Sequence, residues 1–178
     1  MSSAEFFECR LVERVQRGDA EAMSALFDHY VDRIYAYSRH ILGSREDAEE
    51  VTSEAFLKAF RRAADYRGEA PFRGWLYAIA RNACRDRKRQ PRLLTMPIAE
   101  FDGPLPDDSD RIALQADVRA MVRQLPEDYQ DVLILCDVEE WDASEAAVLL
   151  GRSSAATKSL LYRARGALRE QLNTLWKE

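Results

Sequence analysis

Cysteine, histidine and glycine are scarce in this chain, and their scarcity argues against several kinds of chemistry. The 178 residues include three cysteines, two histidines and seven glycines. Cys9, Cys84 and Cys136 lie far apart, so we expect buried small side chains and neither a CxxC site nor a disulfide framework. His29 and His40 have no cysteine or acid at metal-ligand spacing, and no glycine-rich phosphate loop is present. We therefore expect no metal, no cofactor and no enzymatic activity.

Long apolar runs are also missing. No apolar run approaches the roughly 18 residues of a membrane span. The first residues, Met1–Glu8, lack the basic and then apolar order of a signal peptide. Because Leu175–Glu178 follow the last predicted helix directly, we expect no further regulatory domain after it. These features predict a cytoplasmic protein that does not insert into a membrane.

The chain has no excess of positive charge. Its formal net charge is -5. Binding to nucleic acid by bulk charge scales with the number of phosphates that are neutralised, so this composition argues against a protein that coats nucleic acid. Any contact with DNA must be local.

Composition changes abruptly between residues 90 and 110. Four of the six prolines fall there, and Arg92 is the one cation of residues 91–110 against five acids. Such a segment cannot propagate a helix and buries little apolar surface. We predict an all-α fold of two small helical domains, with a first domain over residues 1–90, an acidic, proline-rich linker over 91–110 and a second domain over 111–178.

The first domain has apolar residues at steps of three and four, which predicts helices throughout. Gly43 is expected to end one helix, and Ser44 with Asp47 three residues later resembles a capping box that begins the next. The predicted core stripe of the early helices comprises Val12, Val15, Leu26, Phe27, Tyr30, Ile34, Tyr37 and Ile41.

Two consecutive helices of the first domain carry opposite charge. Among the acids of residues 44–56, Glu46, Asp47, Glu50 and Glu54 project off the apolar face. Acids this close together repel one another unless a cation is near, so this face fits a positively charged protein partner. An ordinary solvated helix face is the alternative.

The second of these helices, predicted after Pro71, is basic. Arg81, Arg85, Lys88 and Arg89 recur at spacings that place four cations along one side. Such a stripe next to Phe72, Trp75 and Tyr77 suits single-stranded or melted nucleic acid, by phosphate neutralisation and base stacking. In the alternative interpretation Trp75 belongs to the core and the arginines face solvent.

The second domain has the order of a helix-turn-helix. Helices are predicted over 112–125 and 127–137, followed by a short Ala- and Leu-rich helix, a turn at Gly151 and a helix that begins near Ser153 or Ser154. The last helix would enter the major groove, with Thr157 and Lys158 near base edges. A plain helical hairpin is the alternative.

Four motifs, in this order, resemble the signatures of extracytoplasmic-function (ECF) sigma factors, group 4 of the sigma-70 family. They are Asp47–Phe56, Trp75–Asn82 with Asp86 and Arg89, Leu125–Pro126, and Lys158–Ser159 ahead of Arg163–Arg165. The resemblance implies a bacterial factor that binds promoter DNA and the largest and second-largest subunits of core RNA polymerase. It also implies control by an anti-sigma factor, in a stress or envelope response.

The resemblance assigns residues to three surfaces. The polymerase-binding residues would be Asp47, Glu50, Ser53, Glu54 and Phe56. The minus-10 element would be captured and opened by Tyr66, Arg67, Phe72, Trp75, Arg81, Asn82, Arg85, Lys88 and Arg89. The minus-35 element would be read by Arg152, Ser153, Ser154, Thr157, Lys158, Arg163 and Arg165. The acidic linker would run through the RNA path of the polymerase.

The chain departs from the family pattern at several positions. Ser53 stands where a glutamine is usual, which removes a long polar contact. Ala155 and Ala156 replace Gly-Thr, and Leu160 replaces an arginine of the last helix. If Leu160 faces the groove, an arginine there would strengthen binding to the upstream element.

Two other classes of protein remain open. A stand-alone helix-turn-helix repressor would bind a duplex operator without polymerase, which the acidic net charge and one short recognition helix disfavour. A helical adaptor without DNA contact would leave Arg81, Asn82, Arg85 and Lys158 dispensable for transcription.

Overall fold

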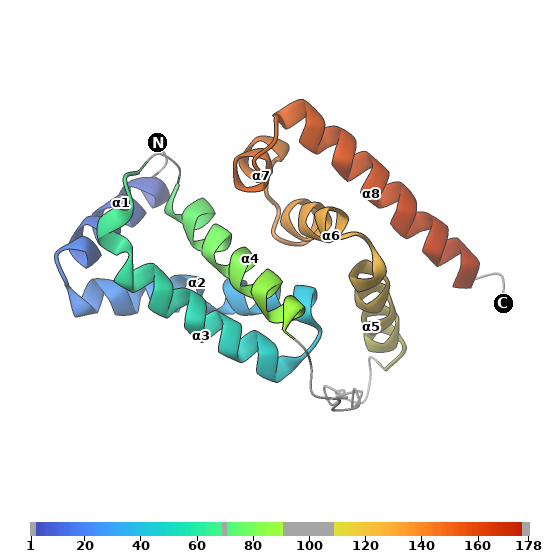
Figure 1. Cartoon of the computed structure of the whole chain (residues 1–178), viewed down its shortest axis with the longest axis horizontal. Helices are drawn as coiled ribbons and strands as arrows, with labels where there is room; N and C mark the ends of the chain where they lie inside the picture. Colours follow the sequence, from blue (N-terminus) through green and yellow to red (C-terminus); the bar gives the residue numbers. More distant parts are fainter. Residues whose placement is uncertain (1–2, 69–70, 91–108, 176–178) are drawn as a thin grey trace.

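The protein is built from helices. The computed structural model describes residues 3–68, 71–90 and 109–175, and these residues contain no strand (Figure 1). The all-α fold class predicted from the sequence is confirmed. Within the described residues, no helix is both long and apolar enough to cross a membrane.

Four helices and one short turn form the first domain. They are α1 (Ser3–Gln16), α2 (Ala20–Leu42), α3 (Arg45–Arg61), the 3-10 turn η1 (Ala63–Asp65) and α4 (Phe72–Arg89). Figure 1 shows α2 and α3 beside one another, with α4 on the side that faces the second domain.

The helix ends follow the local signals in the sequence. Gly43 ends α2 with a φ of 77°, a left-handed conformation that glycine adopts without steric cost. Ser44 precedes α3 and its side chain accepts a hydrogen bond from the Asp47 backbone N–H, as predicted. Asp19 caps α2 in the same way, through the backbone N–H groups of Glu21 and Ala22.

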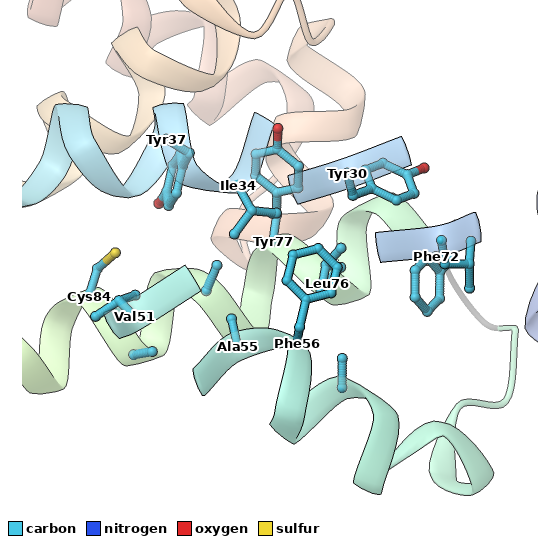
Figure 2. Packing of buried hydrophobic residues seen from close by; sticks show 14 of the residues in the cluster. Tyr30, Ile34, Tyr37, Val51, Ala55, Phe56, Phe72, Leu76, Tyr77 and Cys84 are labelled. Carbon is cyan, nitrogen blue, oxygen red and sulfur yellow. The ribbon is translucent and has the colours of Figure 1, made fainter. Parts of the chain in front are cut away.

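The core of the first domain gathers the predicted stripe, with one exception. Phe27 is 38% exposed, while the other seven predicted residues are buried. Its ring lies against Phe56 at 4.8 Å between centroids, at the edge of the core. Figure 2 shows side chains of α2, α3 and α4, among them Tyr37, Phe56 and Leu76, directed into one cluster.

The three cysteines are free. Cys84 is buried, and burial raises the pKa of its thiol to about 12. Cys136 is half-buried and Cys9 is exposed, so the expectation that all three would be buried is wrong for Cys9.

The second domain comprises four helices and a π-helical turn. They are α5 (Ser109–Gln124), α6 (Glu127–Leu133), the π segment η2 (Ile134–Val138), α7 (Ala143–Leu150) and α8 (Ser154–Leu175). The predicted linker lies mostly at residues 91–108, outside the described residues. The domain boundaries given above therefore stay a prediction.

Two details of this domain differ from the prediction. The helix expected over 112–125 begins at Ser109, because Ser109 and Asp110 do not break helical continuation. The helix expected over 127–137 is divided at Leu133, after which η2 widens the turn and the chain leaves the helix.

The helix-turn-helix is made by α7 and α8. Asp142 and Glu145 form a reciprocal capping box at the start of α7. Gly151 ends α7 with a φ of 64°. The Ser153 hydroxyl then accepts a hydrogen bond from the backbone N–H of Ala156 in the first turn of α8. These contacts match the predicted Gly151 turn and serine cap.

One face of α8 is buried against α6. Leu160 is 3% exposed and Ala164 is fully buried, in a cluster with Leu125, Val132 and Leu133. The condition for an arginine at 160 to strengthen DNA binding, an outward-facing side chain, is therefore not met.

The two domains share one apolar core. Ile134, Leu135, Trp141 and Ala146 of the second domain belong to the same buried cluster as the residues of α2 and α4. In Figure 1, α6 and α7 accordingly lie beside α4. The second domain covers the side of α4 that points away from α3.

We predict that Leu160→Arg destabilises the protein by about 3 kcal/mol or more, because it removes a buried leucine and forces a charge into an apolar site. Urea unfolding measures the loss. Tyr162→Arg is the matched control, since Tyr162 is 82% exposed two residues away. Equal stability of the two variants would contradict the packing described for α8.

We also predict that His40 makes the fold sensitive to acid. Burial, together with the charges of Arg119, Arg123 and Arg39, lowers its pKa from 6.5 to about 4. The folded state thus binds fewer protons than the unfolded state, so stability is full above pH 6.5 and is lost as the pH falls to 4, by up to about 3 kcal/mol.

His40→Gln should lose less stability than wild type between pH 7 and pH 4, measured by urea unfolding at each pH. His29→Gln, at an exposed histidine of the same helix, should follow the wild-type curve. Identical curves for all three proteins would show that His40 does not couple protonation to folding.

Candidate nucleic-acid interface

The acidic face of α3 meets a cation from the same chain. Arg87 of α4 donates from Nε to the Asp47 carboxylate at 2.7 Å and from its Nη2 to Glu50. The Asp47 side chain is 15% exposed, whereas that of Glu50 is 65% exposed. The paired carboxylates raise the pKa of Arg87. This pairing offsets the repulsion between neighbouring acids that the sequence suggested.

The other predicted polymerase-binding residues are exposed or buried according to their position around the helix. Ser53 and Glu54 are exposed, and Glu54 pairs with Lys58 one turn further on. Phe56 is 3% exposed and belongs to the core, consistent with the packing role expected for it. Of the predicted polymerase-binding residues, Glu50, Ser53 and Glu54 are therefore exposed, and the side chain of Asp47 is largely covered.

An aromatic cluster lies where the chain enters α4. The ring of Tyr66 lies 5.7 Å from Phe72 and 5.4 Å from Trp75, measured between centroids. Gln16 holds this segment in place by donating from Nε2 to the backbone carbonyls of Ala63 and Tyr66. Tyr66 and Trp75 are half-buried, and Phe72 is buried at 4% exposure.

Only some of the aromatic residues expected to stack on bases are therefore accessible. Phe72 and Tyr77 belong to the core and have no face open to a base in this conformation. Trp75 and Tyr66 keep part of their surface accessible, and Arg67 beside them is exposed.

The basic stripe of α4 is engaged by the second domain. Arg81 Nε donates to Oδ2 of Asp131 at 2.6 Å, and Arg85 Nη2 donates to the same oxygen at 3.2 Å. Lys88 Nζ donates to Oε1 of Gln130 at 2.8 Å. Of the residues predicted for the minus-10 element on this helix, Asn82, Lys88 and Arg89 are exposed.

A second group of contacts joins the start of α4 to the second domain. The Tyr77 hydroxyl donates to Oε2 of Glu139 at 2.5 Å, and burial with this carboxylate raises the pKa of Tyr77. Arg73 donates to the backbone carbonyl of Glu139 at 2.8 Å and lies over the Trp141 ring, 4.3 Å from its centroid. The Tyr77 and Trp141 rings meet edge to face at 5.0 Å.

Sequence reasoning did not find this interface. Asp131, Glu139 and Trp141 look like ordinary helix residues in the sequence, and no local pattern relates them to residues some fifty positions earlier. The one local signal was that Asp131 directly precedes the apolar run Val132–Cys136.

Helix α8 has one exposed face that carries predicted DNA-binding residues. Lys158, Ser159 and Arg163 are exposed there, and Ser154 is half-buried at its start. Thr157 is fully buried, and its hydroxyl donates to the Ser153 carbonyl at 3.0 Å. Its predicted place beside base edges is therefore corrected, because the side chain points into the domain.

Several predicted cations of this domain are paired within it. Arg165 Nε donates to Asp137 Oδ2 at 3.1 Å, and Arg152 pairs with Asp128. Both arginines and Ser153 stay at the surface. A phosphate would have to share these arginines with the carboxylates.

Tyr162 was missed by the sequence reasoning. It is 82% exposed on α8, four residues after Lys158 and one before Arg163. The signal was available, since Tyr162 falls outside the buried spacing of Thr157, Leu160 and Ala164. A large aromatic side chain exposed to this degree next to two cations fits contact with apolar base edges.

The part of the chain that the structure describes contains no group of three or more histidine, cysteine or acidic side chains able to hold a metal ion. The chemistry of these surfaces is instead hydrogen bonding, ion pairing and stacking.

Comparison with known proteins points to one family. Models of sigma-70 region 2 and sigma-70 region 4 match residues 26–92 and 115–168. The RNA polymerase sigma-H factor of Pseudomonas aeruginosa is 33% identical in an alignment that covers 95% of each chain. SigW of Bacillus subtilis, an ECF RNA polymerase sigma factor, is 29% identical over 92% of this chain and 96% of its own.

The fold agrees with these matches. The solved structure of CnrH, in complex with the cytosolic domain of CnrY, superposes with a TM-score of 0.77 at 24% identity, covering 94% of this chain and 97% of CnrH. Two region models in the right order, a full-length relative and a shared fold all agree. The chain belongs to the sigma-70 family of RNA polymerase sigma factors, as a member of its ECF group.

Proposed function

We propose that this sigma factor binds core RNA polymerase through α3, opens promoter DNA with α4 and reads the upstream element with α8. The observation that carries the proposal is the charge on three helices: α3 exposes acidic side chains, α4 carries a row of cations, and α8 exposes cations on one face. Such a protein joins a cationic protein partner to DNA.

The docking surface consists of Glu50, Ser53 and Glu54, together with Asp47, over the packing residue Phe56. Exposed carboxylates on one face of a helix attract a basic partner surface. Because Arg87 already contacts Asp47 and Glu50, the partner must offer cations that replace or join it. Ser53 is exposed but short, so the carboxylates supply most of the polar contact.

The minus-10 surface combines Tyr66, Arg67 and Trp75 at the aromatic turn with the stripe on α4. Extruding a base from the stack costs a few kcal/mol, and a half-open aromatic cluster flanked by cations can offset that cost. The stripe on α4 consists of Arg81, Asn82, Arg85, Lys88 and Arg89. Phe72 packs against these aromatic rings from the core side.

The minus-35 surface is the exposed side of α8. Lys158 lies in the second turn, where side chains of a recognition helix reach base edges, and Tyr162 follows one turn later. Arg163, Arg165, Arg152, Ser153 and Ser154 surround them as phosphate contacts. Control by an anti-sigma factor in a stress or envelope response, a location in the bacterial cytoplasm and a non-catalytic role belong to the same proposal.

Reversing charge on the docking face should weaken polymerase binding without unfolding the protein. We expect Asp47→Lys combined with Glu50→Lys to lose co-elution with purified core polymerase and run-off transcription, because two attractive charges become repulsive. The matched control is Glu49→Lys, at an exposed acid on a neighbouring face of α3 that pairs with Arg45. If the double variant keeps its circular dichroism and still binds core polymerase at wild-type affinity, the docking assignment is wrong.

Substitutions on α8 should distinguish residues that read bases from residues that contact phosphates. Lys158→Ala should cost about 1–3 kcal/mol of holoenzyme binding and relax the preference at one or two upstream base pairs. Arg163→Ala should weaken all upstream sequences alike and reduce the slope of log affinity against log salt by about 0.9. Titration of promoter variants at several salt concentrations measures both. An unchanged base preference in Lys158→Ala would exclude this side chain from base reading.

A further inference from the structure

The second domain covers residues that the proposed function requires to be open. We propose that α6 is a built-in decoy for DNA, in which the Asp131 carboxylate occupies Arg81 and Arg85 in place of a promoter phosphate and keeps the protein closed until a partner separates the domains. This inference rests on the proposed role of α4 in binding DNA.

The geometry of Asp131 matches that of a bound phosphate oxygen pair. Its Oδ2 accepts from Arg81 Nε at 2.6 Å and from Arg85 Nη2 at 3.2 Å, while Oδ1 accepts from the Tyr37 hydroxyl at 3.2 Å. The carboxylate side chain is 5% exposed. Both oxygens accept hydrogen bonds, and Oδ2 accepts one from each of two guanidinium groups. Charge-assisted hydrogen bonds from arginine bind carboxylate and phosphate oxygens alike.

Other acids extend this pattern along α6. Carboxylate oxygens of Glu127 and Asp128 lie 3.6 and 3.5 Å from nitrogens of Arg85. With Asp131 they form one anionic face, at positions i, i+1 and i+4 of the helix. A row of negative charges opposite a basic stripe reproduces the electrostatics of a nucleic-acid backbone.

The closed contact and DNA compete for the same atoms. The Arg81 side chain is 13% exposed and that of Arg85 is 27% exposed, so a phosphate has little access to either while Asp131 stays in place. Asn82, Lys88 and Arg89, at the rim, are exposed. DNA can therefore meet the edge of α4, but it cannot engage the centre of the stripe without moving α6.

The interface is built in a way that permits opening. Among the described residues, Arg73 Nε, Arg85 Nε and Trp141 Nε1 are buried there without a hydrogen-bond partner. Opening would give these groups to water, which offsets part of the apolar burial of Trp141 and Leu135. A partner that binds only the open form can then shift the equilibrium by its difference in affinity for the two forms.

The test uses the full-length chain and a fluorescent single-stranded dT oligonucleotide, with the radius of gyration from small-angle X-ray scattering as an independent measure of opening. Asp131→Ala should enlarge the radius of gyration and raise the affinity for the oligonucleotide at least about tenfold, because losing one partner of a buried pair strongly destabilises the closed form. The salt slope should steepen by about 1.4, from two arginines at about 0.7 each.

Two variants separate this effect from altered folding or altered net charge. Asp117→Asn removes an exposed carboxylate of α5 in the same domain and should behave as wild type. Arg73→Ala loosens the opposite end of the interface without touching Asp131, so it should also open the protein and raise the affinity. Adding Arg81→Ala and Arg85→Ala to Asp131→Ala should abolish the gain.

Unchanged dimensions and affinity in Arg73→Ala and in a folded Asp131→Ala would overturn the proposal. Opening without a gain in DNA binding would overturn the decoy role in the same way. If Asp131→Ala fails to fold by circular dichroism, Arg73→Ala decides alone. Failure of the sigma-factor proposal would appear separately, as a lack of wild-type binding to core polymerase, and would leave the competition between α6 and DNA intact.

Discussion

The arrangement of the two domains depends on one buried carboxylate. Asp131 is removed from water between α2, α4 and α6, and a charge in such a place is tolerated only when hydrogen bonds and opposite charges replace its hydration. Tyr37, Arg81 and Arg85 supply them. Because these partners come from two helices of the first domain, they fix how the second domain lies on α4, while the apolar contacts of Trp141 and Leu135 supply burial without the same directionality.

Charges are also compensated within the chain on α3. Arg87 compensates Asp47 and Glu50 within the chain, so the acidic docking face and the basic helix are neighbours that partly neutralise one another. Surfaces meant for external partners are therefore paired internally in the free protein. Binding of polymerase or DNA therefore replaces an internal ion pair with an external one. This favours specificity over affinity, because a partner with the wrong charges does not compensate the free energy of the internal contacts that it breaks.

The sequence was most informative where a structure depends on neighbouring residues. Helix ends at Gly43, Ser44 and Gly151 follow from backbone conformation and short-range hydrogen bonds, and the structure reproduces them. The helix-turn-helix followed from the same signals. The errors were of another kind: Phe27 was expected in the core and is partly exposed, and Thr157 was expected at the DNA and is buried. The helical period shows which residues share a face of the helix. Which face is buried depends on what packs against the helix.

The sequence by itself determined the all-α class, the helix-turn-helix and the family resemblance, because periodicity, caps and motif spacing are local properties of the chain. It also placed opposite charges on α3 and α4. Only the tertiary structure decided which charges are free: it brought Asp131 to Arg81 and Arg85, Arg87 to Asp47, and Glu139 to Tyr77. These pairs join residues 40 to 62 positions apart. No local rule encodes them, since the energy of an ion pair depends on distance and burial in the folded chain.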